Sequence, residues 1–282
     1  EISKKKGWKI TSVSISKPKR TRTVKGVKYI LLDLTKKKDI SEKLEDNYDY
    51  VINVSGYTSN IHSKKFKGKI FNSHFYGAKN LIDFFKNKKI KLFVQIGSSA
   101  EYGNASGLLK ESHNCKPVNN YGIAKLRATK YVIKNSKKKN LKASVLRLFQ
   151  VYGPKQGQNR AVMQILKFCI NNKRFPASDG KQIRDFCYVS DVADAIDLTF
   201  KRKITGKIIN IGYGKGVSMK ELINKIKEIA KGGKPEFGLF KNRNHENPIL
   251  VPSISLAKKV LKWKPKINLE KGLIFTKKSL YE

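Results

Sequence analysis

The first half of the chain alternates short apolar stretches with longer amphipathic ones. This alternation predicts strands and helices in turn, and therefore an α/β fold with a parallel sheet. Strands are predicted at residues 9–16, 29–32, 50–54, 92–96 and 143–148, and helices at residues 40–45, 72–86 and 121–135. The stretch 92–96 is apolar almost throughout, which is typical of a strand buried on both faces. The second half is more irregular and is interrupted by Gly and Pro pairs.

The net charge is the most unusual feature of the composition. The 282 residues include 61 Lys and Arg against 21 Asp and Glu, a formal net charge of +40. A charge of this size can indicate a nucleic-acid partner. Only nine of these cations are arginine, the better bidentate ligand for phosphates and bases, and the lysines are spread over the whole chain. We therefore interpret most of them as solvated surface residues and expect no specific nucleic-acid partner, although the positive potential favours an anionic substrate.

Several classes of protein are disfavoured. The sequence has no apolar run of about 18 residues that would cross a membrane, and we expect no secretory leader. The three cysteines (Cys115, Cys169 and Cys187) are scattered, and they form neither a disulfide framework nor a metal-binding pair. We expect a cytoplasmic protein with no metal site and no membrane contact.

The strongest candidate chemistry lies at Ser98, Tyr121 and Lys125. Tyr121 and Lys125 are four residues apart, so they share one face of the predicted helix. A tyrosine is a poor acid–base group at neutral pH because its reference pKa is about 10, and a neighbouring ammonium favours the phenolate. Ser98 follows a buried strand, at the carboxyl edge where open α/β sheets bind ligands. Its hydroxyl could bind the same substrate oxygen as the tyrosine.

A glycine cluster at Gly212, Gly214 and Gly216 follows another predicted strand. Its spacing is GxGxG, not the GxGxxG of dinucleotide-binding turns. Ser218 and Glu221 form a capping box for the next helix. We interpret the cluster as a tight loop and not as a phosphate cradle.

An ordered series of motifs resembles a known family over nearly the whole chain. The motifs are IGSSAEYG at residues 96–103, YGIAK at 121–125, RLFQVYGP at 147–154, DGKQIRDFCYVSDV at 179–192, NIG at 210–212 and LKWKP at 261–265. Together they resemble the extended short-chain dehydrogenases/reductases, which include NAD-dependent epimerases, dehydratases and reductases of nucleotide sugars in carbohydrate biosynthesis. The 4-keto-sugar reductases look most similar.

The resemblance implies a role for each matching residue. Tyr121 would be the catalytic acid–base, Lys125 would bind the nicotinamide ribose and tune Tyr121, and Ser98 would be the catalytic serine. Further cofactor-binding residues would be Ser14, Ser16, Lys17, Asp33, Leu34, Val54, Ser55, Gly56 and Phe149. The substrate would contact Ser99, Gln150 and Arg184, with the Arg184 guanidinium pairing with the diphosphate.

Some positions depart from the family pattern. Ser99 and Ala100 stand where 4,6-dehydratases carry an acidic pair, and neither is a useful general acid or base, which argues against dehydration. Gln150 replaces an Asn, and Glu101 occupies a position that is usually hydrophobic. His74 also replaces an Asn, and we expect it to make a structural hydrogen bond across the sheet edge.

The resemblance also predicts how the chain is organised. We expect a Rossmann-like doubly wound sheet in residues 1–155 and a smaller α/β substrate region in residues 156–282, with parts of 186–212 packing back on the first domain. Such a domain normally opens with a strand, a glycine-rich turn and a helix that bind the pyrophosphate. Residues 1–7 look like the tail of a helix, so we expect the first strand and phosphate loop to be missing, with a gap in the sheet and weak cofactor binding.

The cofactor and the reaction stay open between alternatives. Residues 14–22 contain no acid, which favours NADP over NAD because a 2′-phosphate suits cations and hydroxyls. The resemblance implies hydride transfer at sugar C4 of a nucleoside-diphosphate sugar, by an epimerase with bound NAD or by a 4-keto reductase with NADPH. A homodimer is one possible assembly. The alternative is a non-catalytic NAD(P)- or RNA-binding member of the same fold.

Overall fold

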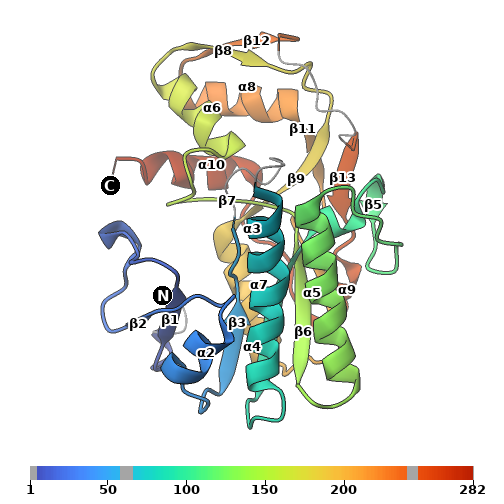
Figure 1. Ribbon diagram of the computed structural model, residues 1–282. Coiled ribbons are helices and arrows are strands. Elements are labelled where there is room, and N and C mark those ends of the chain that lie inside the picture. Colours follow the sequence, from blue (N-terminus) through green and yellow to red (C-terminus); the bar gives the residue numbers. More distant parts are fainter. Residues whose placement is uncertain (1–4, 58–65, 240–246, 282) are drawn as a thin grey trace. The chain divides into compact units, whose positions relative to one another are not determined.

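The computed structural model describes residues 5–57, 66–239 and 247–281 (Figure 1). The chain divides into two compact units. Unit 1 contains Glu1–Gly103, Cys115–Arg147 and Ala195–Ile209, and unit 2 contains Asn104–Asn114, Leu148–Asp194 and Asn210–Glu282. The chain therefore passes between the units several times, and a segment from its second half belongs to unit 1.

Unit 1 contains two separate sheets. Strands β1 (Thr11–Ser14) and β2 (Lys28–Leu31) pair in parallel, with Thr11 opposite Lys28. The second sheet has the order β10-β6-β4-β3, and its strands are β3 (Tyr50–Asn53), β4 (Leu92–Ser98), β6 (Ala143–Leu148) and β10 (Ile208–Ile211). Among the described residues no ladder joins β1 to β3, so the break predicted between these strands is present.

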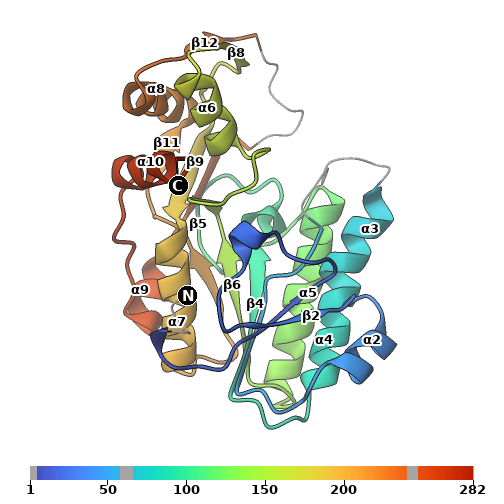
Figure 2. The same ribbon diagram turned by 90° about the vertical axis from the view of Figure 1, so that its left-hand side faces the viewer.

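The helices of unit 1 cover both faces of the four-stranded sheet. They are α2 (Lys37–Lys43), α3 (Lys67–Phe71), the π-helical turn η3 (Asn72–Tyr76), α4 (Gly77–Phe85), α5 (Asn120–Lys137) and, through its residues 195–201, α7 (Val189–Lys201). Figure 2 shows α4 and α5 on one face and α7 on the other. This arrangement confirms the predicted doubly wound α/β fold.

The apolar patterns explain the core of unit 1. In α4 the buried residues Ala78, Leu81, Ile82 and Phe85 recur at helical spacing and form one face. Strand β4 is buried along six of its seven residues, because helices lie on both faces of it. The predicted strands of the first half are all found, with ends shifted by at most two residues.

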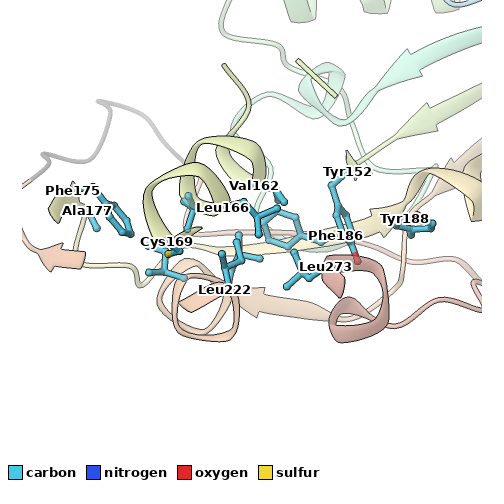
Figure 3. Packing of buried hydrophobic residues seen from close by; sticks show 13 residues of the cluster. Tyr152, Val162, Leu166, Cys169, Phe175, Ala177, Phe186, Tyr188, Leu222 and Leu273 are labelled. Carbon is cyan, nitrogen blue, oxygen red and sulfur yellow. The ribbon is translucent and has the colours of Figure 1, made fainter. Parts of the chain in front are cut away.

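Unit 2 is built around a mixed sheet in which β11 (Gly216–Ser218), β9 (Ile183–Tyr188), β13 (Ile249–Pro252) and β5 (Gly107–Leu109) follow one another. Strand β7 (Gln150–Tyr152) also pairs with β9, and β8 (Arg174–Ala177) pairs with β12 (Lys234–Phe237). Helices α6 (Ala161–Ile170), α8 (Met219–Ala230), α9 (Ser255–Leu261) and α10 (Leu269–Lys278) complete it. Figure 3 shows its core, where Leu166, Leu222 and Leu273 are fully buried.

None of the described helices has the length and apolar character needed to span a bilayer. Cys115, Cys169 and Cys187 are free thiols, and the last two are buried.

Candidate functional site

Ser98 is the last residue of β4 and caps the short 3₁₀ turn η4 (Ser99–Tyr102). Its Oγ accepts a hydrogen bond from the Ala100 N–H at 3.2 Å, and the Glu101 carboxylate accepts one from the Ser98 N–H at 2.8 Å. This reciprocal pair is a capping box. Because the Ser98 hydroxyl accepts within the box, its own proton stays available to an external oxygen.

Helix α5 carries both Tyr121 and Lys125. The helix starts where Asn119 accepts a hydrogen bond from the Gly122 N–H at 2.8 Å. The Lys125 side chain is buried, and its Nζ donates to the Ile96 carbonyl of β4 at 2.9 Å. An ammonium in such a place needs polar partners, and this carbonyl is one of them.

A close backbone contact joins the start of α5 to η4. A Cβ added at Gly122 would lie 2.5 Å from the Ala100 carbonyl oxygen, so only glycine fits there without a shift. The turn that begins at Ser98 and the helix turn that carries Tyr121 are therefore packed directly on each other. The elements that carry the three residues predicted as catalytic are therefore packed against one another.

His74 lies beside this group and comes from the π-helical turn η3. Its ring meets the Tyr121 ring edge-on, with centroids 4.8 Å apart, and its Nε2 is 2.9 Å from the Tyr57 carbonyl oxygen. Burial, followed by the charge of Lys125, lowers the pKa of His74 to about 4. The imidazole is therefore neutral at pH 7, and its bond to the loop after β3 is the structural hydrogen bond that we expected.

Gly56 explains how His74 fits. A Cβ at Gly56 would lie 2.0 Å from the His74 ring, and its φ of +136° favours glycine. The His74 Nδ1 is buried and has no hydrogen-bond partner among the described residues. A π-helical turn at this point is a feature often found at functional sites, and the periodicity of residues 72–86 did not reveal it.

The predicted cofactor residues of β1 and β2 lie at the carboxyl ends of these strands. The Ser14 hydroxyl donates to the Ser16 carbonyl at 2.8 Å, and Ser16 and Lys17 are exposed. The Asp33 carboxylate accepts from the N–H and the hydroxyl of Thr35, so it closes a turn. Leu34 is half-buried beside this turn.

The residues after β3 also form a turn. The Ser55 N–H and hydroxyl both donate to the Asn53 side-chain oxygen, at 3.0 and 2.6 Å. Asn53 is buried and donates to Gln95 of the neighbouring strand β4. Val54 is 69% exposed, which leaves this apolar side chain open to a ligand.

The predicted substrate residues Ser99, Gln150 and Arg184, and the predicted cofactor residue Phe149, are divided between the units. Ser99 is a buried residue of η4 in unit 1. In unit 2, Phe149 is buried with its N–H bonded to the Ile211 carbonyl, and Gln150 is exposed on β7. Arg184 is buried on β9, where its guanidinium donates to the carbonyls of Ile183 and Pro248.

Three N–H groups of the glycine cluster in unit 2 are occupied by a side chain of the protein itself. The N–H groups of Tyr213, Gly214 and Lys215 donate to the Asp185 carboxylate at 2.7, 2.6 and 3.2 Å. Burial raises the pKa of Asp185 to about 6, and the three N–H donors act against this rise. The loop is a backbone nest that the protein fills with its own anion, in agreement with the tight loop predicted.

A buried ion pair behind Ser98 was missed by the sequence reasoning. Arg147 Nε donates to Glu101 Oε2 at 2.8 Å, and both side chains are almost fully buried. The Ser-x-x-Glu spacing at residues 98–101 was a visible capping signal, but the partner lies 46 positions away.

Some of the described residues have the chemistry to hold part of a dinucleotide. A nicotinamide ribose would suit the edge of β4. The residues there are the buried Lys125, the half-buried Ser98 and Tyr121, and the closely packed Gly56. No group of three or more His, Cys, Asp or Glu in the described ranges is arranged as metal ligands.

Fold and site together define an α/β protein with a serine, a tyrosine and a lysine at the carboxyl edge of a doubly wound sheet. The model of the NAD dependent epimerase/dehydratase family matches residues 3–212. This match covers most of the chain, and the protein belongs to that family.

Two curated relatives illustrate the family. An uncharacterised UDP-glucose epimerase of Bacillus subtilis is 29% identical over 208 residues, which cover 71% of this chain and 66% of that protein. A UDP-glucuronate 4-epimerase of Thermodesulfobacterium geofontis is 30% identical over 207 residues, covering 71% of this chain and 62% of that protein. The chain thus spans less than two thirds of the length of these relatives.

Solved structures show the same fold. A UDP-glucose 4-epimerase of Thermotoga maritima, solved with UDP-glucose, superposes with a TM-score of 0.90 at 23% identity and covers 99% of this chain and 94% of that one. A UDP-glucose 4-epimerase of Thermus thermophilus, solved with NAD, gives a TM-score of 0.88 at 22% identity and covers 98% and 92%. The homodimer, the cytoplasmic location and the lack of a nucleic-acid partner stay predictions.

Proposed function

We propose that the protein is an NAD(P)-dependent enzyme that acts on a nucleoside-diphosphate sugar, as an epimerase or as a 4-keto reductase. The observation that carries the proposal is the packing of Ser98, Tyr121 and Lys125 around one edge of β4, with Lys125 bonded to Ile96. The relatives named for UDP-glucose and UDP-glucuronate epimerisation support a nucleotide sugar as the substrate.

The residues of unit 1 would do the acid–base work. When bound, the nicotinamide cofactor would supply or accept a hydride at sugar C4. Tyr121 would give a proton to the C4 oxygen or take one from it, and Ser98 would donate a hydrogen bond to the same oxygen. The buried ammonium of Lys125 would bind the nicotinamide ribose. Neutral His74 would hold the Tyr121 ring without adding a second charge.

Other residues would hold the two ligands. Asp33 and Leu34 would lie at the adenine, and Val54, Ser55, Gly56 and Phe149 would line the rest of the cofactor. Ser99 and Gln150 would contact the sugar, and Arg184 would pair with the diphosphate. The acid-free end of β1, with Ser14, Ser16 and Lys17, supports NADP, whereas neighbouring structures were solved with NAD.

The decisive test is Tyr121→Phe, with Tyr131→Phe as its matched control. Tyr131 lies on the same helix, and its hydroxyl donates to Asp83. We expect Tyr121→Phe to fold normally and to lose about 10² to 10⁴ in kcat, because it removes the proton donor. Tyr131→Phe should keep its activity. Activity of Tyr121→Phe within about twofold of wild type would contradict the proposal.

Two assays distinguish the reactions. An epimerase would convert a UDP-hexose without added cofactor, and a reductase would consume NADPH with a 4-keto-6-deoxy sugar nucleotide. Absence of turnover in both, together with steeply salt-dependent binding of unrelated RNA, would favour the non-catalytic alternative.

A further inference from the structure

The Glu101 carboxylate joins two parts of unit 1 that are distant in sequence. Its Oε1 accepts from the Ser98 N–H at 2.8 Å, and its Oε2 accepts from Arg147 Nε at 2.8 Å. Ser98 ends β4, whereas Arg147 lies within the neighbouring strand β6. One side chain therefore connects the backbone of the proposed catalytic serine to a second strand of the sheet.

This connection is fully removed from water. The Glu101 side chain is 0% exposed and the Arg147 side chain is 3% exposed. Burying two charges costs free energy that their attraction offsets only with good geometry, and well-packed apolar side chains often serve stability equally well. Stability alone therefore gives no reason for an acid at Glu101. An apolar side chain at position 101 could not accept a hydrogen bond from the Ser98 N–H, whereas the Glu101 carboxylate does.

The surroundings are shaped for the carboxylate. A Cβ at Gly97 would lie 2.6 Å from Glu101 Oε1 and 3.1 Å from Arg147 Cγ, so glycine leaves the space that the pair occupies. The Arg147 guanidinium also lies over the Tyr102 ring, 4.8 Å from its centroid. Four residues next to Ser98 thus pack closely on one another, namely Gly97, Glu101, Tyr102 and Arg147.

We propose that Glu101 and Arg147 are positioning residues, which fix the η4 turn so that the Ser98 hydroxyl points at the reacting substrate oxygen. The proposal rests on the catalytic role proposed for Ser98. We call this connection the tie, and it acts on Ser98 through the backbone. The Glu101 carboxylate accepts a hydrogen bond from the Ser98 N–H, and Arg147 of the neighbouring strand donates to the same carboxylate and fixes its position. Displacement of a catalytic group by about 1 Å can cost about 10²-fold in rate, so a small loosening of the turn should be visible in kcat.

The chain supplies a matched control in unit 2. Ser218 and Glu221 form the same capping box at the start of α8, where the Ser218 N–H donates to Glu221 at 2.7 Å. This box is exposed, and no role in the proposed reaction is assigned to it. Glu221→Leu should leave kcat, KM and amide exchange at residues 98–102 unchanged.

Two variants separate positioning from stability. The double variant Glu101→Leu with Arg147→Leu removes both buried charges, so its thermal midpoint should stay near that of wild type, whereas the Ser98 N–H loses its acceptor. The single variant Glu101→Gln keeps an acceptor oxygen for Ser98 but leaves Arg147 without a counter-charge, so its midpoint should fall. We expect the double variant to be the more stable and the less active of the two.

The measurements are thermal unfolding, amide hydrogen exchange at residues 98–102, and kcat and KM. For the double variant we expect faster exchange at these amides and a kcat lower by about 10- to 100-fold, with KM within about twofold. Glu101→Gln should retain most of the exchange protection and of kcat. A double variant with wild-type exchange and kcat would overturn the proposal, and so would activity that simply follows stability.

The same data keep the two proposals apart. If the wild-type protein turns over no sugar nucleotide, the proposed function fails, while the exchange rates still decide whether Glu101 holds the Ser98 turn. If the double variant does not fold, Glu101→Ala, which removes the acceptor of the Ser98 N–H, takes its place: lost protection at residues 98–102 supports the tie, and wild-type protection overturns it.

Discussion

The two sheets of unit 1 carry opposite ends of the proposed site and differ in how they are built. The four-stranded sheet carries Ser98, and its strand β4 is buried along six of seven residues. In the ribbon formed by β1 and β2, no residue of either strand is fully buried, and Leu31 is 50% exposed. The ribbon end carries Ser16 and Lys17, for which we propose a role in cofactor selection.

The difference follows from what each end has to do. Proton and hydride transfer need groups held to a fraction of an ångström, so they are best built on buried elements with packed neighbours. Choice between two cofactors that differ by one phosphate depends on charge, which acts at longer range and tolerates a mobile side chain. The comparison predicts that substitutions in the two sheets affect different properties.

The largest effect should come from the core of the four-stranded sheet. Phe93 of β4 is fully buried, and Phe93→Ala should lower the free energy of unfolding by about 3–5 kcal/mol through lost burial and a cavity. The same truncation at the half-exposed Leu31 of β2 should cost less than about 1 kcal/mol. Urea unfolding followed by circular dichroism measures both. Equal costs would show that the ribbon is as well packed as the sheet.

The second effect is a pH dependence of stability at the proposed catalytic end. His74 has a pKa of about 4 in the folded protein, against a reference near 6.5 for the unfolded chain. Its contribution to stability is therefore complete above pH 6.5 and is lost as the pH falls towards 4, a change on the order of 3 kcal/mol.

A difference measurement isolates His74. Asp185, whose pKa is raised to about 6, acts with the opposite sign, since its contribution is complete below about pH 4 and is lost as the pH rises through 6. The free energy of unfolding is compared between wild type and His74→Asn at pH 4.5 and at pH 7. Because Asp185 is present in both proteins, its contribution cancels in the difference. An identical pH dependence in the two proteins would show that His74 does not titrate as a buried group.

The third effect tests how closely the catalytic end is packed. Gly122→Ala should push α5 from η4, because its Cβ would lie 2.5 Å from the Ala100 carbonyl oxygen, and should lower kcat by about 10-fold or more. Gly68→Ala in α3 is the control, since among the described residues outside its own helix backbone and chain neighbours no atom lies within 4 Å of the added Cβ, and it should leave kcat unchanged. Steady-state kinetics give kcat for both variants. Equal kcat values would show that the protein accommodates a Cβ at position 122 without displacing the catalytic groups.

The smallest effect is expected at the ribbon. Lys17→Glu should leave stability unchanged and shift the ratio of NADP to NAD affinity towards NAD by roughly tenfold, equivalent to about 1.4 kcal/mol. Lys142→Glu, an exposed lysine just before β6, is the control for a general change in charge. Calorimetric titration of each variant with both dinucleotides gives the ratio. A ratio that does not change at Lys17 would remove the ribbon from cofactor selection.

Sequence reasoning was most successful where structure is decided locally. The alternation of apolar and amphipathic stretches predicted the strands of unit 1, and β6 has the predicted bounds. The helix predicted at 72–86 begins earlier, at Lys67, and contains a π-helical turn. Periodicity follows from backbone geometry and needs only near neighbours, whereas the extra residue of a π turn is stabilised by packing against α5 and the loop at Tyr57.

The sequence by itself determined the family motifs, the fold class and the spacing of Tyr121 and Lys125 on one helix face. Tertiary structure alone decided which residues from distant parts of the chain meet. His74 meets Tyr121 across 47 positions, Asp185 fills a nest 28 to 30 positions away, and Glu101 pairs with Arg147 across 46. The free-energy cost of burying a charge is offset only where an opposite charge or hydrogen-bonding groups lie against it. These groups come together only after strands that are distant in the sequence have packed against one another.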